Sequence, residues 1–288
     1  TKQLVLELDN SDGVFFRNSG SVYASYLVAN KKIRVWCGVV KADGTEEVVP
    51  KGEFFTKSWK APEDDVICRV TGWDRSKRMK EEDYSTSDVL EDKTISELVE
   101  TVAKAYGLAD EDLDIDETTD IVDYAWFESK SYWSHLQDLA IGDGGAVFFN
   151  PEGKLRFQSR SYLSSVTSSV ATLQDTDIFE RMQEEWDQNR LKNRIVVPVR
   201  PLTAASSEEV FNLQETITVP VGGTKSLTVF FAEKPVINPT TPSITGGANI
   251  SIQSWTAYAF GGSLVLHNPG GSDETVTQIT IDGQVLEE

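Results

Sequence analysis

An acidic segment near the middle of the chain comes closest, in residue types and spacing, to a metal site. Calcium loops of twelve residues take their oxygen ligands from positions 1, 3, 5, 7, 9 and 12. Those positions are filled here by Asp112, Asp114, Asp116, Thr118, Asp120 and Asp123. The sixth position, where the loop needs glycine, is Glu117, and an aspartate at the last position is too short to replace the bidentate glutamate. Because Leu113 and Ile115 alternate with the acids, we predict an acidic strand (Asp112–Tyr124) and no metal, with the five aspartates as a weak calcium candidate.

The remaining chemistry-bearing residues do not form a recognisable catalytic set. His135 and His267, the two histidines, have no cysteine or second histidine at ligand spacing, so we predict packing or surface side chains and no zinc. Adjacent acids such as Glu184 and Glu185 would point apart in a strand and do not make a glycosidase pair. The sequence contains no serine-hydrolase elbow, metalloprotease helix, phosphate loop or dinucleotide fingerprint. We therefore expect neither enzymatic activity nor a cofactor.

Aromatic side chains allow a different kind of site, because a sugar can stack on an exposed ring. The candidates for glycan stacking are Trp133, Trp255 and Tyr258. The alternative, which we favour, is that the rings around the second predicted helix fill the core beside it.

Composition limits the partners of the protein. The chain has 288 residues and a formal net charge of −19, from 27 basic and 46 acidic side chains. Such a surface repels nucleic acid and anionic membranes, and no apolar run approaches the roughly 20 residues of a membrane helix. Cys37 and Cys68 lie in apolar, strand-like runs and are predicted to be buried free thiols. Because the first residue is Thr1, we expect the sequence to be a piece of a longer chain.

The segment from Leu90 to Phe157 has the clearest local signals. Thr94-Ile-Ser-Glu97 fits a capping box at the start of a helix that ends at Tyr106 before Gly107. A second helix is predicted over Tyr132–Ile141. A hairpin follows, in which Ala146–Phe149 pairs with Lys154–Phe157 across a type I turn.

The chain on either side of this segment is predicted to be β-structure. Leu4, Leu6 and Leu8 alternate with polar residues, and a hairpin is predicted between Val22–Val28 and Ile33–Val40. The predicted strands are completed by Val48–Trp59 and Val66–Gly72, giving five or six short strands, which is typical of a small barrel or sandwich. Residues 159–169 are predicted as a loop and an edge strand, and 178–190 as either a helix or a long strand.

From Leu202 onward, Thr, Ser, Gly and Val dominate and helical periodicity is absent. The pattern predicts a second, all-β domain of six or seven strands, either a sandwich or a barrel. Its last strand is predicted over Thr275–Ile281, followed by a hairpin turn at Asp282-Gly283.

Three segments resemble phage tail hub proteins. Residues 124–157 read YAWFESKSYWSHLQDLAIGDGGAVFFNPEGKLRF and resemble the insert of that family, in which a Tyr-Ala-Trp-Phe segment, a short helix and a Gly-Gly pair precede a hairpin. Residues 54–84 resemble the end of the family's first barrel, where a strand closes on an Asp-Arg pair, here Asp74-Arg75. Residues 189–201 resemble the strand that re-enters the barrel.

The resemblance implies an α+β, mainly β fold, in which a tail-tube-like β-barrel is interrupted by a small α/β insert and followed by an all-β domain. The barrel is expected from residues 1–90 and 186–200, the insert from 91–185 and the last domain from 202–288. Tail hubs of this family are homotrimers that contact tail-tube, distal tail and tip or fibre proteins, with DNA as passing cargo. The expected location is the tail of a virion assembled in the bacterial cytoplasm. The alternatives are a carbohydrate-binding module of a tail tip and a fragment of a tail-associated cell-wall hydrolase.

Overall fold

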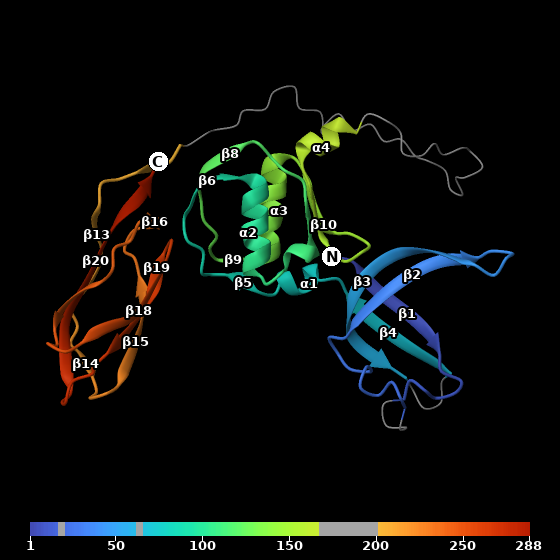
Figure 1. The fold of residues 1–288 in the computed structure, drawn as a ribbon, viewed down its shortest axis with the longest axis horizontal. Helices are drawn as coiled ribbons and strands as arrows, with labels where there is room; N and C mark the ends of the chain where they lie inside the picture. Colours follow the sequence, from blue (N-terminus) through green and yellow to red (C-terminus); the bar gives the residue numbers. More distant parts are fainter. Residues whose placement is uncertain (17–20, 62–65, 167–200) are drawn as a thin grey trace, which may run out of the picture. The chain divides into compact units, whose positions relative to one another are not determined.

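Figure 1 shows the computed structural model, which describes residues 1–16, 21–61, 66–166 and 201–288. The chain forms two compact units, Thr1–Leu163 and Ser164–Glu288. The fold is mainly β with a smaller helical part, as predicted for an α+β protein. The segment at 178–190 and the strand expected at 186–200 lie outside the described residues.

The first unit begins with a four-stranded antiparallel sheet. Its strands are β1 (Gln3–Asp9), β2 (Lys32–Val40), β3 (Glu46–Lys60) and β4 (Ile67–Trp73), in the order β1-β4-β3-β2. The sheet has the form of half a barrel. The predicted alternation is confirmed in β1, where Leu4 is buried and Leu6 and Leu8 are partly buried between exposed residues.

The hairpin predicted between Val22–Val28 and Ile33–Val40 is wrong. Residues 22–28 form consecutive turns, held by local hydrogen bonds such as those from Ala24 N to Ser21 O and from Tyr26 N to Tyr23 O. Strand β2 pairs instead with β3. The seven apolar and small residues of the segment do not alternate, so nothing in their pattern distinguishes a strand from packed turns.

An α/β segment follows between Ser76 and Ser165, and all but its last two residues belong to the first unit. Its helices are α1 (Ser76–Met79), α2 (Ile95–Ala105), a 3-10 turn η1 (Asp110–Asp112), α3 (Tyr132–Asp143) and α4 (Arg160–Ser165). Its strands are β5 (Asp83–Tyr84), β6 (Leu90–Thr94), β7 (Leu113–Ile115), β8 (Ile121–Ala125), β9 (Lys130–Ser131), β10 (Ala146–Phe149) and β11 (Leu155–Gln158). The strands form small sheets of order β10-β11-β7, β5-β9 and β6-β8.

Local sequence signals account for both long helices. Thr94 Oγ1 accepts a hydrogen bond from Glu97 N (3.3 Å), and the Glu97 carboxylate accepts one from Thr94 N (2.8 Å), which confirms the capping box. Helix α3 ends at Gly144, whose φ of 76° is left-handed and favours glycine. One core made of Leu98, Leu136, Phe157 and their apolar neighbours joins α2 and α3 to the β10-β11 hairpin.

Two predictions in this segment are wrong. The acidic strand Asp112–Tyr124 is two separate strands, because β7 pairs with β11 while β8 pairs with β6 in another sheet. Residues 160–165, predicted as loop and strand, form the helix α4.

The second unit is a β-sandwich. The long strand β20 (Glu274–Glu287) pairs with five shorter strands, and a separate sheet has the order β15-β19-β18. The other strands are β12 (Thr203–Ala204), β13 (Glu208–Leu213), β14 (Ile217–Val219), β15 (Thr224–Phe230), β16 (Val236–Ile237), β17 (Ser243–Gly246), β18 (Ser251–Tyr258) and β19 (Gly261–His267). Val229 and Leu264 of one sheet share a buried core with Ile279 and Ile281 of the other. The turn predicted at Asp282-Gly283 is wrong, because β20 continues through it and pairs with β13 there.

Candidate functional site

The acidic segment that suggested calcium is instead neutralised by arginines. Four of its carboxylates form ion pairs that point to different parts of the first unit. The pairs are Asp112–Arg75, Asp114–Arg156, Asp116–Arg156 and Asp120–Arg160, at 2.9, 3.0, 2.7 and 2.7 Å. Across the part of the chain that the structure describes, no group of three or more His, Cys, Asp or Glu side chains could hold a metal ion. The arginine partners are far away in sequence, so the spacing of the acids alone could not reveal them.

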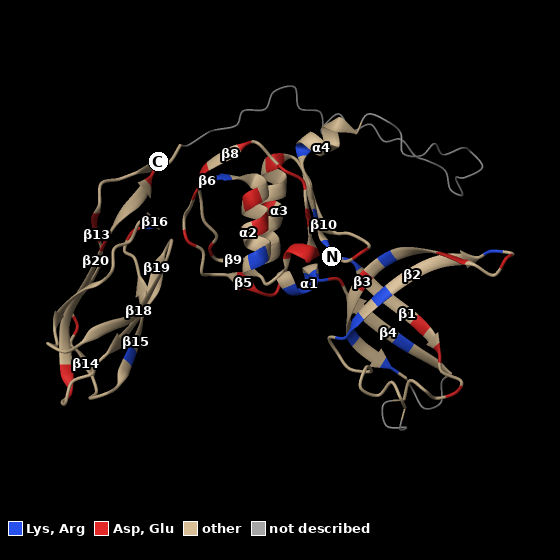
Figure 2. Ribbon diagram, viewed as in Figure 1, with Lys and Arg blue, Asp and Glu red and all other residues tan. Residues whose placement is uncertain are grey.

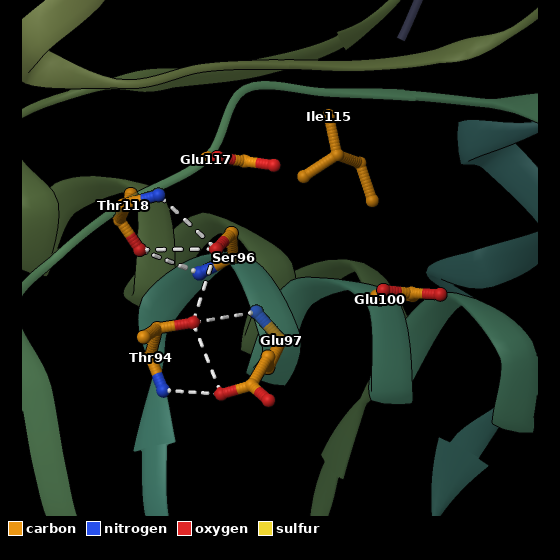
Figure 3. Close-up of a pocket in the computed structure, with 7 residues that line it drawn as sticks. All are labelled: Thr94, Ser96, Glu97, Glu100, Ile115, Glu117 and Thr118. Atoms are coloured by element: carbon orange, nitrogen blue, oxygen red, sulfur yellow. Dashed lines mark hydrogen bonds between the residues drawn. The ribbon is translucent and has the colours of Figure 1, made fainter.

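A hollow of about 390 Å³ lies beside the start of α2 (Figure 3). Four of its polar residues, Thr94, Ser96, Glu97 and Thr118, are hydrogen-bonded to one another. Ser96 N donates to Thr118 Oγ1 (2.9 Å), and Thr118 N donates to Ser96 Oγ (3.2 Å). Hydrogen bonds from Thr94 lower the pKa of the Glu97 carboxyl. These groups cap the helix and tie the segment after β7 to it, so they serve the structure at this point.

A second hollow, of about 480 Å³, is lined by His135, by apolar side chains of α2, α3 and β8, and by charged residues that include Lys130 and Asp138. His135 is 7% exposed, and its ring meets Phe127 edge-on with centroids 5.0 Å apart. Burial lowers the pKa of this imidazole, which favours its neutral form. His135 is therefore a packing residue of the α3 core, whereas His267 lies partly exposed on β19.

The three candidate glycan-stacking rings are not brought together. Trp133 is 4% exposed and stacks on Phe149 with centroids 5.9 Å apart, so its faces are covered by the core. In the second unit, Trp255 packs against the sandwich core, and Tyr258, three residues further along β18, lies on the opposite face of the sheet. Of these rings, Tyr258 alone lies on an outward face.

The two cysteines differ in how far they are exposed to solvent. Cys68 is fully buried in β4, and burial raises the pKa of its thiol. Cys37 is exposed, contrary to the prediction, because no described element packs on the part of β2 that carries it.

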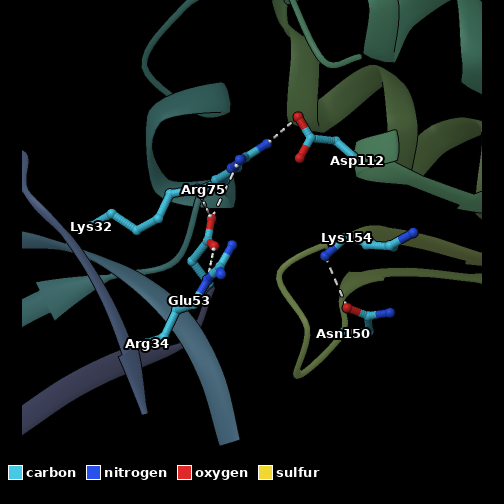
Figure 4. A network of polar contacts seen from close by, with 7 residues as sticks. All are labelled: Lys32, Arg34, Glu53, Arg75, Asp112, Asn150 and Lys154. Carbon is cyan, nitrogen blue, oxygen red and sulfur yellow. Dashed lines mark hydrogen bonds and ion pairs between the residues drawn. The ribbon is translucent and has the colours of Figure 1, made fainter. Parts of the chain in front are cut away.

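A network of charges around Glu53 joins the half-barrel sheet to the α/β segment (Figure 4). Glu53 lies on β3, and its side chain is only 3% exposed. Its carboxylate pairs with Lys32 (3.1 Å) and Arg34 (3.0 Å) of β2 and with Arg75 (3.3 Å). Arg75 pairs in turn with Asp112 at the end of η1 (2.9 Å), and although burial opposes the shift, Arg75 lowers the pKa of that carboxyl. The network fixes the α/β segment on the sheet from which the β2–β3 hairpin extends.

The outer part of that hairpin, residues 36–50, carries a cluster of exposed apolar side chains, and we call it the β2–β3 arm. Strand β4 pairs with β3 from Phe55 to Lys60, and beyond that point β2 and β3 pair, within the described residues, only with each other. Figure 1 shows the arm extending past β1 and β4. Its apolar side chains are about half exposed or more, at 51% for Trp36, 65% for Val39, 70% for Val40 and 54% for both Val48 and Val49.

Each face of the β2–β3 arm carries mainly apolar side chains and one glutamate. On one face Cys37 lies opposite Val49 and Val39 opposite Glu47, and on the other Trp36 lies opposite Pro50 and Val40 opposite Glu46. A two-stranded hairpin is marginally stable alone in water, and large exposed apolar patches mark interaction sites. Its exposed apolar side chains make the arm the candidate functional site.

The sequence matches no protein-family model, and a search of curated proteins finds no similar sequence. The function is therefore argued from the residues and their arrangement.

Proposed function

We propose that this protein is a structural subunit of a phage or prophage tail hub, which assembles with two further copies of itself into a ring between the tail tube and the distal tip. The observation that carries the proposal is the β2–β3 arm, an extended hairpin with exposed apolar side chains on both of its faces. The resemblance of residues 54–84, 124–157 and 189–201 to tail hubs supplies the kind of assembly.

The energetics favour assembly through the arm. Burying a large aliphatic side chain contributes about 1.5–3 kcal/mol when it is fully exposed beforehand, so a half-exposed valine gains roughly 1 kcal/mol. Four such valines and the half-exposed Trp36 give on the order of 5 kcal/mol per arm. This offsets part of the cost of association in lost translational and rotational freedom, which is about 4–15 kcal/mol. A ring uses each arm once, and its closure adds contacts without leaving a free interface.

The charge of the chain suits a ring around passing DNA. A net charge of −19 repels phosphates, so DNA would move past the inner surface with little adhesion. No helix in the described parts of the chain is long and apolar enough to cross a membrane.

Light scattering on the full chain tests the proposal. We expect a species near three times 32.0 kDa at micromolar concentration, and rings with a central channel in particle images. A variant with Val39, Val40, Val48 and Val49 all changed to Thr keeps the β-propensity and shape of the arm but makes it polar. It should dissociate at concentrations at least tenfold higher than those at which the unchanged chain dissociates.

The matched control is Val221→Thr, the same substitution at a valine of the second unit that is 52% exposed. It should leave the mass of the assembled species in light scattering unchanged. A monomer from the unchanged chain, or a trimer that survives all four arm substitutions, would contradict the proposal.

A further inference from the structure

The outward face of the sheet β15-β19-β18 in the second unit has an unusual composition. Alternate residues of the three strands point away from the sandwich core and line up across the sheet in four rows. The rows are Thr224–His267–Ser251, Ser226–Val265–Ser254, Thr228–Ser263–Thr256 and Phe230–Gly261–Tyr258. Seven of the twelve residues are Ser or Thr, and all seven are exposed. We call these twelve residues the hydroxyl face.

Charge is absent from this face, although the chain as a whole is strongly acidic. Lys225 is the only Lys, Arg, Asp or Glu in the three strands, and it belongs to the alternate set that contains the core residues Leu227 and Val229. Figure 2 shows the same sheet almost without charged positions. A phosphate-bearing partner would find no cation here.

Two aromatic rings stand at one end of the hydroxyl face. Phe230 is 67% exposed, and Tyr258 lies two strands away in the same row. Gly261, between them on β19, contributes no side chain. Tyr258 also stacks with Phe260, their centroids 6.1 Å apart, which holds its ring in place. The face therefore combines ring surfaces with a regular array of hydroxyls spaced about 4.8 Å across the strands and about 6.7 Å along them.

We propose that the hydroxyl face binds a neutral polysaccharide. The apolar C–H face of a sugar ring can stack on Phe230 and Tyr258, because the faces of aromatic rings carry partial negative charge. The sugar hydroxyls and the Ser and Thr hydroxyls each both donate and accept hydrogen bonds, so a polyol can pair with an array of them in many registers. A protein partner fits less well, because serine is depleted in protein interfaces. The proposal does not depend on assembly through the β2–β3 arm.

Affinity electrophoresis of the full chain tests this inference. Native gels would contain dextran, mannan or galactan as neutral probes and alginate as an anionic probe. We expect at least one neutral polysaccharide to retard the chain and alginate to have no effect. Changing Tyr258 and Phe230 together to Ala should weaken the retardation at least fivefold, and Ser263→Glu, which places a charge in the middle of the face, should abolish it.

Tyr26→Ala is the matched control, since Tyr26 is 61% exposed in the first unit and should not affect retardation. Circular dichroism and the melting temperature of each variant establish that the sandwich is folded. Ser263 is exposed, so its variant tests the face even if the aromatic variant unfolds. No retardation in any neutral gel, retardation unchanged by the folded variants, or stronger binding to alginate would overturn the proposal.

Discussion

Substitution of Glu53 tests whether the charge network holds the α/β segment on the half-barrel sheet. The Glu53 side chain is 3% exposed, and its carboxylate forms ion pairs with three basic side chains at distances of up to 3.3 Å. Breaking a fully buried ion pair costs about 3–5 kcal/mol, because a buried charge is left unpaired. Here Lys32 and Arg34 are 44% and 56% exposed and can be hydrated, and Arg75 keeps Asp112. We therefore expect Glu53→Gln to lower the free energy of unfolding by about 2 kcal/mol.

The assay is thermal unfolding of the full chain by calorimetry. For a unit of 163 residues, each kcal/mol corresponds to about 2–4 °C, so its transition should fall by roughly 4–8 °C. The matched control is Glu47→Gln on the same strand, whose side chain is 63% exposed and pairs only with Lys41 in the described structure. Exposed pairs contribute about 0–1 kcal/mol, so this transition should hardly move. Equal shifts for the two variants would refute the reasoning.

A double-mutant cycle locates the coupling. Asp112→Asn removes the other partner of Arg75, and its effect should not add to that of Glu53→Gln, because both carboxylates stabilise the same guanidinium. Additive effects would mean that the two ion pairs stabilise the sheet and the α/β segment separately.

Three further results are expected in the first unit. In urea unfolding, Gly153→Ala should lower the free energy of unfolding by about 2–4 kcal/mol, because φ is +87° and the new Cβ would lie 2.7 Å from Glu53 Cβ. The control Gly44→Ala, at φ +82° with nothing within 4 Å of the new Cβ, should lower it by only about 1 kcal/mol. Thr94→Ala should cost about 1 kcal/mol and Thr94→Ser almost nothing, since serine also caps the helix; equal losses would contradict the capping role. Burial lowers the pKa of His135, so just below the ordinary value of about 6.5 the unfolded state binds more protons than the folded state. The free energy of unfolding should therefore decrease as the pH falls through about 6.5 toward the pKa of the folded state. His135→Gln should remove this pH dependence from melting curves.

Local signals predicted the two long helices and the β10-β11 hairpin of the α/β segment, because their physical causes are short-range. The capping box at Thr94, the stop near Gly144 and the turn between β10 and β11 each depend on neighbouring residues. What the sequence could not supply was long-range pairing. The arginine partners of the acidic segment are up to about forty residues away, and the continuation of β20 past Gly283 depends on pairing with β13. No periodicity encodes such contacts.

In the β2–β3 arm the sequence pattern and the exposure of the side chains disagree. An apolar run such as Val35–Val40, without alternation, is typical of a strand that is buried on both faces. In the described structure the outer part of this strand is covered on neither face. Val48 and Val49 repeat the mismatch on the partner strand, so it is a property of the hairpin and not of one residue. Natural sequences break local rules mainly at functional sites. A strand pattern suited to full burial, placed where the described parts of its own chain leave it exposed, fits our proposal that the covering surface belongs to another copy of the protein.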